Sequence, residues 1–109
     1  MSYSVKITRN FEREAKPLVK KYASLRSELA ELGEELSENP EKGDSLGNSL
    51  YKIRLAIASK GKGKRGGARV ITYLKTEQNN IYLLSIYDKG EKDTISDQEI
   101  KEILNEGIE

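Results

Sequence analysis

The chain is 109 residues long, carries a net charge of +1 at pH 7 and contains neither cysteine nor histidine. Its length predicts one domain over residues 1–109, and the two missing residue types exclude a disulfide framework, the usual zinc ligands and any catalytic triad built on imidazole. Because no apolar run could cross a bilayer and the start does not resemble a signal peptide, we expect a cytoplasmic protein without a membrane partner. We expect no metal and no cofactor, so any chemistry must come from Lys, Arg, Tyr, Asp or Glu.

The first part of the chain predicts a short strand followed by two helices. Polar and apolar residues alternate over 3–8, and Asn10 is predicted to cap a helix whose apolar residues are Phe11, Ala15, Leu18 and Tyr22. Pro17 removes one backbone hydrogen bond inside this helix and predicts a kink or an early end. A second helix has leucines at 25, 29, 32 and 36 on one stripe and ends at Asn39-Pro40.

The second part predicts a loop, three strands and a final helix. Residues 40–49 read as a loop, and strand-like runs follow at 51–57, 68–75 and 82–89. In the last run, strict alternation places Tyr82, Leu84 and Ile86 on one face and Leu83, Ser85, Tyr87 and Lys89 on the other. Ser96 and Glu99 form a capping-box pattern at the start of the final helix. The fold class is therefore α+β in the order β-α-α-β-β-β-α: an antiparallel sheet with a helical hairpin on one face and a C-terminal helix.

Charge is sorted along the chain in a way that the net value hides. Residues 51–75 contain eight lysines and arginines and no acid, whereas residues 28–44 and 88–109 are acidic. A solubilising surface normally mixes both signs, so an acid-free cationic block indicates contact with the phosphates of a nucleic acid. For any single residue of the block, the ordinary alternative of a solvated cation on the wet side of a sheet stays open.

Two groups of residues in this region are candidates for function. The first is a glycine-rich segment between two strands, whose cations would grip RNA phosphates: Lys60, Lys62, Lys64 and Arg65. It matches neither the P-loop nor the dinucleotide fingerprint, and a flexible hairpin tip is the alternative. The second group lies on the strands, where period-two alternation leaves an open cationic face: Lys52, Arg54, Arg69, Tyr87 and Lys89.

Several motifs together resemble a known family. They are Phe11-x-Arg-Glu-Ala-Lys16, Tyr51-Lys-Ile-Arg54, Gly63-Lys-x-Gly-Gly-Ala-Arg-Val-Ile71 and Tyr87-x-Lys89, and the pattern from about Val5 to Leu104 closely resembles the HigB-like branch of the RelE/ParE toxin superfamily. The resemblance implies a RelE-like fold and a toxin of a type II toxin–antitoxin system. It also implies a ribosome-dependent endoribonuclease that cuts translated mRNA and inhibits translation. The implied partner is an antitoxin, typically with a helix-turn-helix, that neutralises the toxin and represses the operon by binding operator DNA.

By this resemblance and by their shared face, the strand residues receive roles. RNA carries its own nucleophile, the 2′-hydroxyl, so neither a metal nor a histidine is required. Arg69 would meet the scissile phosphate with help from Arg54, and Lys52 is the candidate base, since crowding by like charges favours a neutral amine. Lys89 or Tyr87 would protonate the leaving oxygen. Many relatives have serine where this chain has Asp88, and alternation should turn Asp88 to the opposite side of its strand.

Two other functions stay open from the sequence. One is a ParE-like inhibitor of DNA gyrase that performs no chemistry, against which Arg69, Tyr87 and Lys89 argue. The other is a non-catalytic RNA-binding module, whose binding would depend strongly on salt while the message stayed intact.

Overall fold

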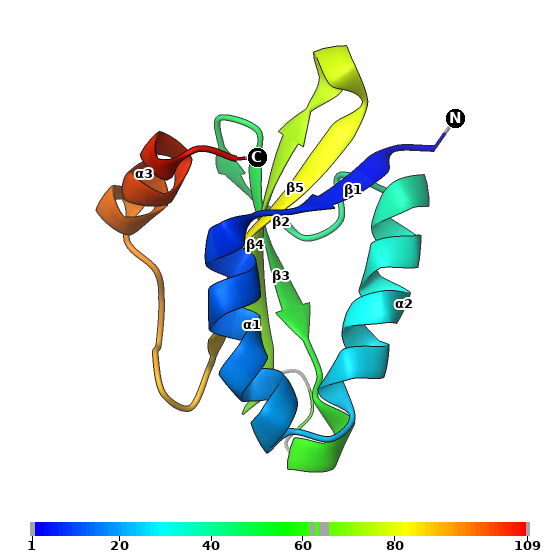
Figure 1. Cartoon of the computed structure of the whole chain (residues 1–109), viewed down its shortest axis with the longest axis vertical. Coiled ribbons are helices and arrows are strands. Elements are labelled where there is room, and N and C mark those ends of the chain that lie inside the picture. The colour runs from blue at the N-terminus through cyan, green and yellow to red at the C-terminus, as the bar shows by residue number, and fades with distance from the viewer. Residues whose placement is uncertain (1, 62, 64–65, 109) are drawn as a thin grey trace.

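The computed structural model describes residues 2–61, 63 and 66–108, in which a five-stranded sheet is combined with three α-helices (Figure 1). The helices and strands are, in chain order, β1 (Ser4–Ile7), α1 (Arg9–Lys21), α2 (Leu25–Glu38), β2 (Asp44–Gly47), β3 (Leu50–Leu55), β4 (Ala68–Lys75), β5 (Asn80–Asp88) and α3 (Asp97–Glu106). Two single 3-10 turns, Ala58–Lys60 and Thr76–Gln78, follow β3 and β4.

The sheet separates two apolar clusters. Its strand order is β1-β5-β4-β3-β2, with β1 parallel to β5 and the other neighbours antiparallel. One cluster joins α1 and α2 to one face of the sheet, through residues such as Phe11, Leu32 and Val70. The other joins α3 to the opposite face through Ile71, Leu84 and Ile100. This arrangement confirms the predicted α+β fold with a helical hairpin and a C-terminal helix, although the β1–β5 pair is parallel rather than antiparallel.

The start of α1 differs from the prediction. Thr8, not Asn10, is the N-cap, because its Oγ1 accepts a hydrogen bond from Phe11 N at 3.1 Å. Asn10 is the second residue of the helix and is buried, and its Nδ2 donates to Leu84 O at 2.9 Å. Thr8 Oγ1 also donates to Leu83 O of β5 at 2.8 Å, so the docking of the chain on β5 fixes where the helix begins, and cap preferences alone could not distinguish the two residues.

The helix α1 also continues past Pro17 to Lys21, so the predicted early end is wrong. Pro17 lies on the exposed side of α1. The carbonyl that loses its hydrogen-bond donor there can be satisfied by water, and the buried residues Ala15 and Leu18 hold both neighbouring turns on the sheet.

A strand occupies part of the segment that the sequence assigned to a loop. All four residues of β2 are exposed, so no alternation of buried and exposed residues marks them as a strand. Asn48 and Ser49 have φ values of 54° and 64°, as a type I′ hairpin turn requires, and they join β2 to β3. The residues of the turn, Asn48 and Ser49, were therefore the only indication of this hairpin in the sequence, because the hydrophobic pattern gave none.

A β-bulge in β5 overturns the predicted alternation of that strand. Ile71 pairs with Ser85 and Thr72 with Leu83, so β5 holds one extra residue, Leu84. Leu83 and Ile86 consequently both face the helical hairpin, while Tyr82, Leu84 and Tyr87 lie on the α3 side. The face predicted to hold Tyr82, Leu84 and Ile86 is therefore split, and Tyr87 is separated from Leu83.

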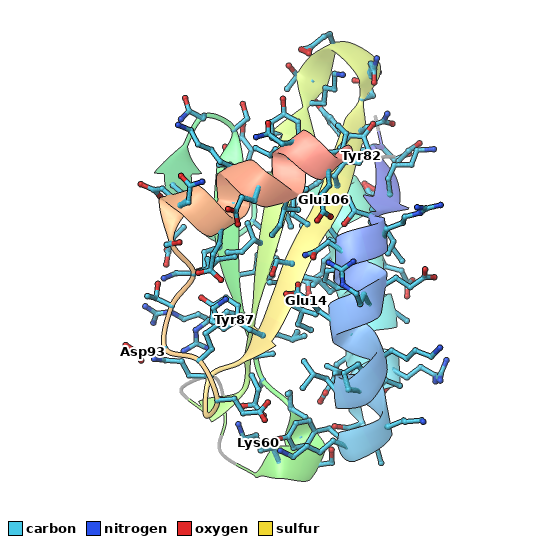
Figure 2. All side chains as sticks on the ribbon, turned by 60° about the vertical axis from the view of Figure 1, so that its left-hand side comes forward. Glu14, Lys60, Tyr82, Tyr87, Asp93 and Glu106 are labelled. Atoms are coloured by element: carbon cyan, nitrogen blue, oxygen red, sulfur yellow. The ribbon has the colours of Figure 1, made fainter. Side chains whose placement is uncertain are left out.

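Side chains of α1 hold the bulge in place. The strand β1 ends opposite Leu83, so the outer edge of β5 beyond this point has no strand partner. There Asn10 donates to Leu84 O, and Glu14 Oε1 accepts from Ile86 N at 3.3 Å and from Ser85 Oγ at 2.7 Å. In Figure 2, Glu14 projects from α1 toward β5. These side chains replace the backbone bonds that a longer β1 would have made.

We predict that Glu14→Ala destabilises the protein by about 1 to 3 kcal/mol, because it removes the side-chain acceptor of Ser85 Oγ and Ile86 N and one of the two acceptors of Asn10 Nδ2. The free energy of unfolding would be measured by urea denaturation. Glu31→Ala is the matched control, since Glu31 is an exposed acid on α2 and its loss should change stability by no more than about 0.5 kcal/mol. Equal losses in both variants would contradict the role of Glu14.

Candidate functional site

Three of the predicted site residues form a row across adjacent strands. Arg54 of β3 pairs with Arg69 of β4, and Arg69 pairs with Tyr87 of β5. Residues that are directly opposite in a ladder project from the same face, with Cβ atoms about 4.5–5.5 Å apart. Because Ile53 and Ala68 contact the helical hairpin, the row lies on the other face of the sheet, close to where β3 and β5 end and β4 begins.

Exposure changes along this row. Arg69 is buried, with 6% of its surface exposed, and its guanidinium donates to Ala68 O at 3.1 Å. Arg54 is exposed, and Lys52, two residues earlier on the same face of β3, is half-buried. Lys52 and Arg54 also line a hollow of about 360 Å³ beside β2. The cationic surface therefore has a fixed central arginine and two more accessible cations at its side.

Tyr87, the third member of the row, is as buried as Arg69. Only 6% of the residue is exposed, and its hydroxyl oxygen is buried without a hydrogen bond of normal geometry among the described residues. Burial raises the pKa of the phenol, while the neighbouring Thr94 side chain and the charge of Arg69 oppose this rise. Lys92 Nζ lies 5.6 Å from the ring centroid. Tyr87 is thus a protonated phenol at neutral pH, enclosed by the connection between β5 and α3.

An acid that the sequence analysis missed lies beside these cations. Lys89 Nζ donates to the carboxylate of Asp93 and, at 3.3 Å, to its backbone oxygen. The hydrogen bond and charge of Lys89, followed by the charges of Lys52 and Arg69, lower the pKa of Asp93. Figure 2 shows Asp93 on the connection that leads from the Tyr87 end of β5 to α3. The four-residue spacing of Lys89 and Asp93 was a signal, but only the path of the connection brings Asp93 near Lys52 and Arg69.

Asp88 lies on the opposite side of β5 from Tyr87, which confirms the prediction from alternation. Its carboxylate is buried and accepts hydrogen bonds from Tyr22 Oη at 2.6 Å and from Lys60 Nζ. Lys60, whose side chain is 12% exposed, is thereby held in an ion pair and is not part of the Arg54–Arg69–Tyr87 row. The other predicted RNA contacts of the loop, Lys62, Lys64 and Arg65, lie outside the described residues, so their role stays a prediction.

The arrangement suits anion binding and charge stabilisation. Across the described residues, no cluster of three or more Asp, Glu, His or Cys side chains could hold a metal ion. What the site offers is a fixed arginine between a second arginine and a protonated phenol, with lysines on either side. No helix in the described part of the chain is long and apolar enough to cross a membrane.

Comparison with known proteins identifies the family. The family model of the RelE toxin of the RelE/RelB toxin–antitoxin system matches residues 4–107. Among solved structures, a double arginine-to-alanine variant of the E. coli toxin RelE in the free state aligns with a TM-score of 0.62 and 19% sequence identity. That alignment covers 98% of this chain and 99% of the other. At this identity the structural match supports the fold, whereas the family model spans nearly the whole sequence. The chain therefore belongs to the RelE toxin family of toxin–antitoxin systems.

Proposed function

We propose that the protein is a ribosome-dependent endoribonuclease that cleaves translated mRNA in the cytoplasm and so inhibits translation. The observation that carries this proposal is the row of Arg54, Arg69 and Tyr87, which three neighbouring strands present together on the face opposite the helical hairpin. Its members match the motifs that resemble the HigB-like branch of the superfamily, and assignment to that branch is part of the proposal.

The reaction needs no group beyond those that RNA and this surface supply. The 2′-hydroxyl oxygen attacks the adjacent phosphorus, the bond from phosphorus to the 5′-oxygen breaks, and a 2′,3′-cyclic phosphate and a 5′-hydroxyl result. Negative charge grows on the phosphorane oxygens in the transition state, and fixed donors stabilise it best. Arg69 suits this task, because β4 is paired on both sides and its guanidinium is already tied to Ala68 O.

Proton transfer is assigned to the residues around Arg69. Lys52 is the proposed base for the 2′-hydroxyl. Tyr87 is the first proposed acid for the leaving 5′-oxygen, because its phenol is protonated at neutral pH and it stands beside Arg69, whose charge opposes the rise that burial causes in the pKa of the phenol. Lys89 is the second proposed acid. Its ammonium group must first leave the Asp93 carboxylate and then contact the RNA. Because the Tyr87 hydroxyl is enclosed, its contact with RNA requires the connection between β5 and α3 to move.

We attribute the need for a ribosome to a task that these side chains leave undone. Arg54, Arg69 and Tyr87 can stabilise charge and supply a proton, but they do little to align the 2′-hydroxyl, phosphorus and 5′-oxygen in one line. A ribosome that holds the mRNA would supply this alignment. The cognate antitoxin is the other proposed partner, of the helix-turn-helix type, and contact with operator DNA would occur only through it.

Expression of the chain without its antitoxin is predicted to stop growth and to produce new 5′ ends in translated messages, because ribosome-held mRNA is the proposed substrate. Primer extension on translated and untranslated transcripts from the same cells provides the measurement and its control. Growth arrest with DNA damage and intact mRNA would instead support a gyrase inhibitor. Ribosome association without any cleavage would support an RNA-binding module.

Arg69→Ala is predicted to lower the single-turnover cleavage rate on saturating ribosomes by about 100-fold, as expected when a preorganised donor to the transition state is lost. Lys75→Ala is the control, since Lys75 is a partly exposed cation at the far end of the same strand. The double variant Lys62→Ala, Lys64→Ala should weaken binding instead and flatten its salt dependence by a log–log slope of about one per lost phosphate contact. A loop variant as slow as Arg69→Ala at saturation would refute this division.

Asp93→Asn is predicted to tighten binding to ribosome-bound mRNA several-fold at low salt, because it frees Lys89 and removes a negative charge near Lys52 and Arg69. The gain should shrink as salt is added, since exposed charges are screened. Binding would be measured by salt titration against Glu91→Gln, which removes the same charge from an exposed position on the same connection. Equal effects of the two substitutions would show that only net charge matters.

A further inference from the structure

A buried carboxylate lies directly behind the row of site residues. Asp88 is the last residue of β5, and 3% of its surface is exposed. Its Oδ2 accepts from Tyr22 Oη at 2.6 Å, and its Oδ1 accepts from Lys60 Nζ and from Gly90 N at 2.8 Å. The three donors come from separate segments: the C-cap of α1, the 3-10 turn after β3, and the turn that leaves β5.

The backbone around Asp88 is tied in the same place. Asp88 O accepts from the amides of Glu91 at 3.0 Å and Lys92 at 2.9 Å, and Lys89 N donates to Gly67 O at 3.0 Å. Gly67 directly precedes β4, and an added Cβ there would lie 2.1 Å from Leu55 O. The Asp88 carboxylate therefore joins the end of β5 to the end of α1 and to the 3-10 turn after β3. The adjoining backbone bonds tie the same point to the residue before β4 and to the start of the connection to α3.

The charges in this cluster depend on one another. Burial alone would raise the pKa of Asp88, but the hydrogen bonds from Lys60, Tyr22 and Gly90 lower it to about 2, so the group is ionised at neutral pH. A buried carboxylate that loses its cation is strongly unfavourable, whereas neutralising both partners costs much less. Lys60 Nζ also lies 5.6 Å from the centroid of the Tyr22 ring. Lys60 is thus held on the Asp88 side of β5 and away from the open cationic face.

We propose that Asp88 is a positioning residue that, together with Tyr22 and Lys60, fixes the end of β5 so that Tyr87 and Lys89 keep their places on the opposite face. The two site residues are its immediate neighbours in the chain, so any shift of the Asp88 backbone moves both. The effect on catalysis rests on the proposed ribonuclease function. The structural effect, that the Asp88 carboxylate orders the end of β5, is independent of that function.

The main experiment compares Asp88→Asn, Lys60→Met and the double variant in single-turnover cleavage of ribosome-bound mRNA. Each single variant should lower the rate constant on the order of 10-fold or more, because one buried partner is left uncompensated. The reaction amplitude should stay near that of the wild type, and the neutral double variant should recover most of the rate. Tyr22→Phe keeps the ion pair and loses only one hydrogen bond, so it should slow cleavage by about 3- to 10-fold.

Glu35→Gln serves as the matched control. Glu35 also pairs with a lysine, Lys42, at 3.0 Å, but both side chains are accessible, at 56% and 31%, and they lie away from β5. This variant should keep the wild-type rate constant. A fall in amplitude at an unchanged rate constant in the Asp88 variants would mean lost folded protein only, and would overturn the positioning role. A binding defect in Lys60→Met that the double variant does not relieve would show that Lys60 contacts RNA itself.

Amide hydrogen exchange tests the structural part without any cleavage assay. In Asp88→Asn, the amide of Gly90 should exchange on the order of 10-fold faster because its charge-assisted acceptor is weakened, and so should the amide of Lys89, whose bond to Gly67 O depends on an ordered end of β5. The amide of Leu32 in α2 should not change. Tyr22→Phe provides the same measurement if Asp88→Asn does not fold. Unchanged exchange at Lys89 and Gly90 would overturn the inference. Absence of cleavage by the wild-type protein, with faster exchange in the variants, would refute the proposed function alone.

Discussion

The hydrogen bonds from α1 to the outer edge of β5 are the constraint on which the site depends. Where β1 ends, Asn10 and Glu14 take over as partners of Leu84 O and Ile86 N, and the strand can then hold one extra residue. A strand with unbroken alternation would place Tyr87 on the same side as Leu83, under the helical hairpin. With the bulge, Tyr87 stands beside Arg69 on the opposite face, and Ile86 joins Leu83 in the core beneath α1 and α2.

The bulge in β5 also determines on which face of the sheet the charged residues after it lie. After the bulge, Asp88 turns toward α1 and is neutralised by Lys60, so its negative charge does not reach the open face. Lys52, Arg54 and Arg69 then form a surface whose neighbouring carboxylates come from other segments: Asp44 of β2, which pairs with Lys52, and Asp93 of the connection after β5. The bulge and the Asp88 ion pair together keep the carboxylate of Asp88, the residue after Tyr87, away from the Arg54–Arg69–Tyr87 row. A site for a polyanion needs this separation, since a carboxylate within the row would cancel the field of the cations.

Regular periodicity made most of the fold predictable. The leucines of α2 and the alternating residues Tyr51, Ile53 and Leu55 of β3 lie on the faces that their spacing indicated. The errors arose where a tertiary contact decides the local structure. Thr8 caps α1 while its side chain is docked on β5, and β2 exists through pairing with β3 without any buried residue. The bulge at Leu84 is bonded to Glu14 of α1.

For the site, alternation indicated that Lys52 and Arg54 share a face of their strand, and the strand register then showed that Arg69 lies between Arg54 and Tyr87. Sequence could not indicate the ion pair of Lys60 and Asp88, because 28 residues separate them and both were compatible with exposed positions. Nor could it show that Asp93 approaches Lys52 and Arg69, since that depends on the course of the connection to α3.

The most direct test uses purified ribosomes carrying a defined mRNA, with the end groups of the products determined by mass spectrometry. If the Arg54–Arg69–Tyr87 row promotes attack by the 2′-hydroxyl, the upstream fragment will end in a 2′,3′-cyclic phosphate and the downstream fragment will begin with a 5′-hydroxyl. Both products should vanish when ribosomes are omitted. An intact message in the presence of ribosomes, or an upstream fragment that ends in a plain 3′-hydroxyl, would contradict this mechanism.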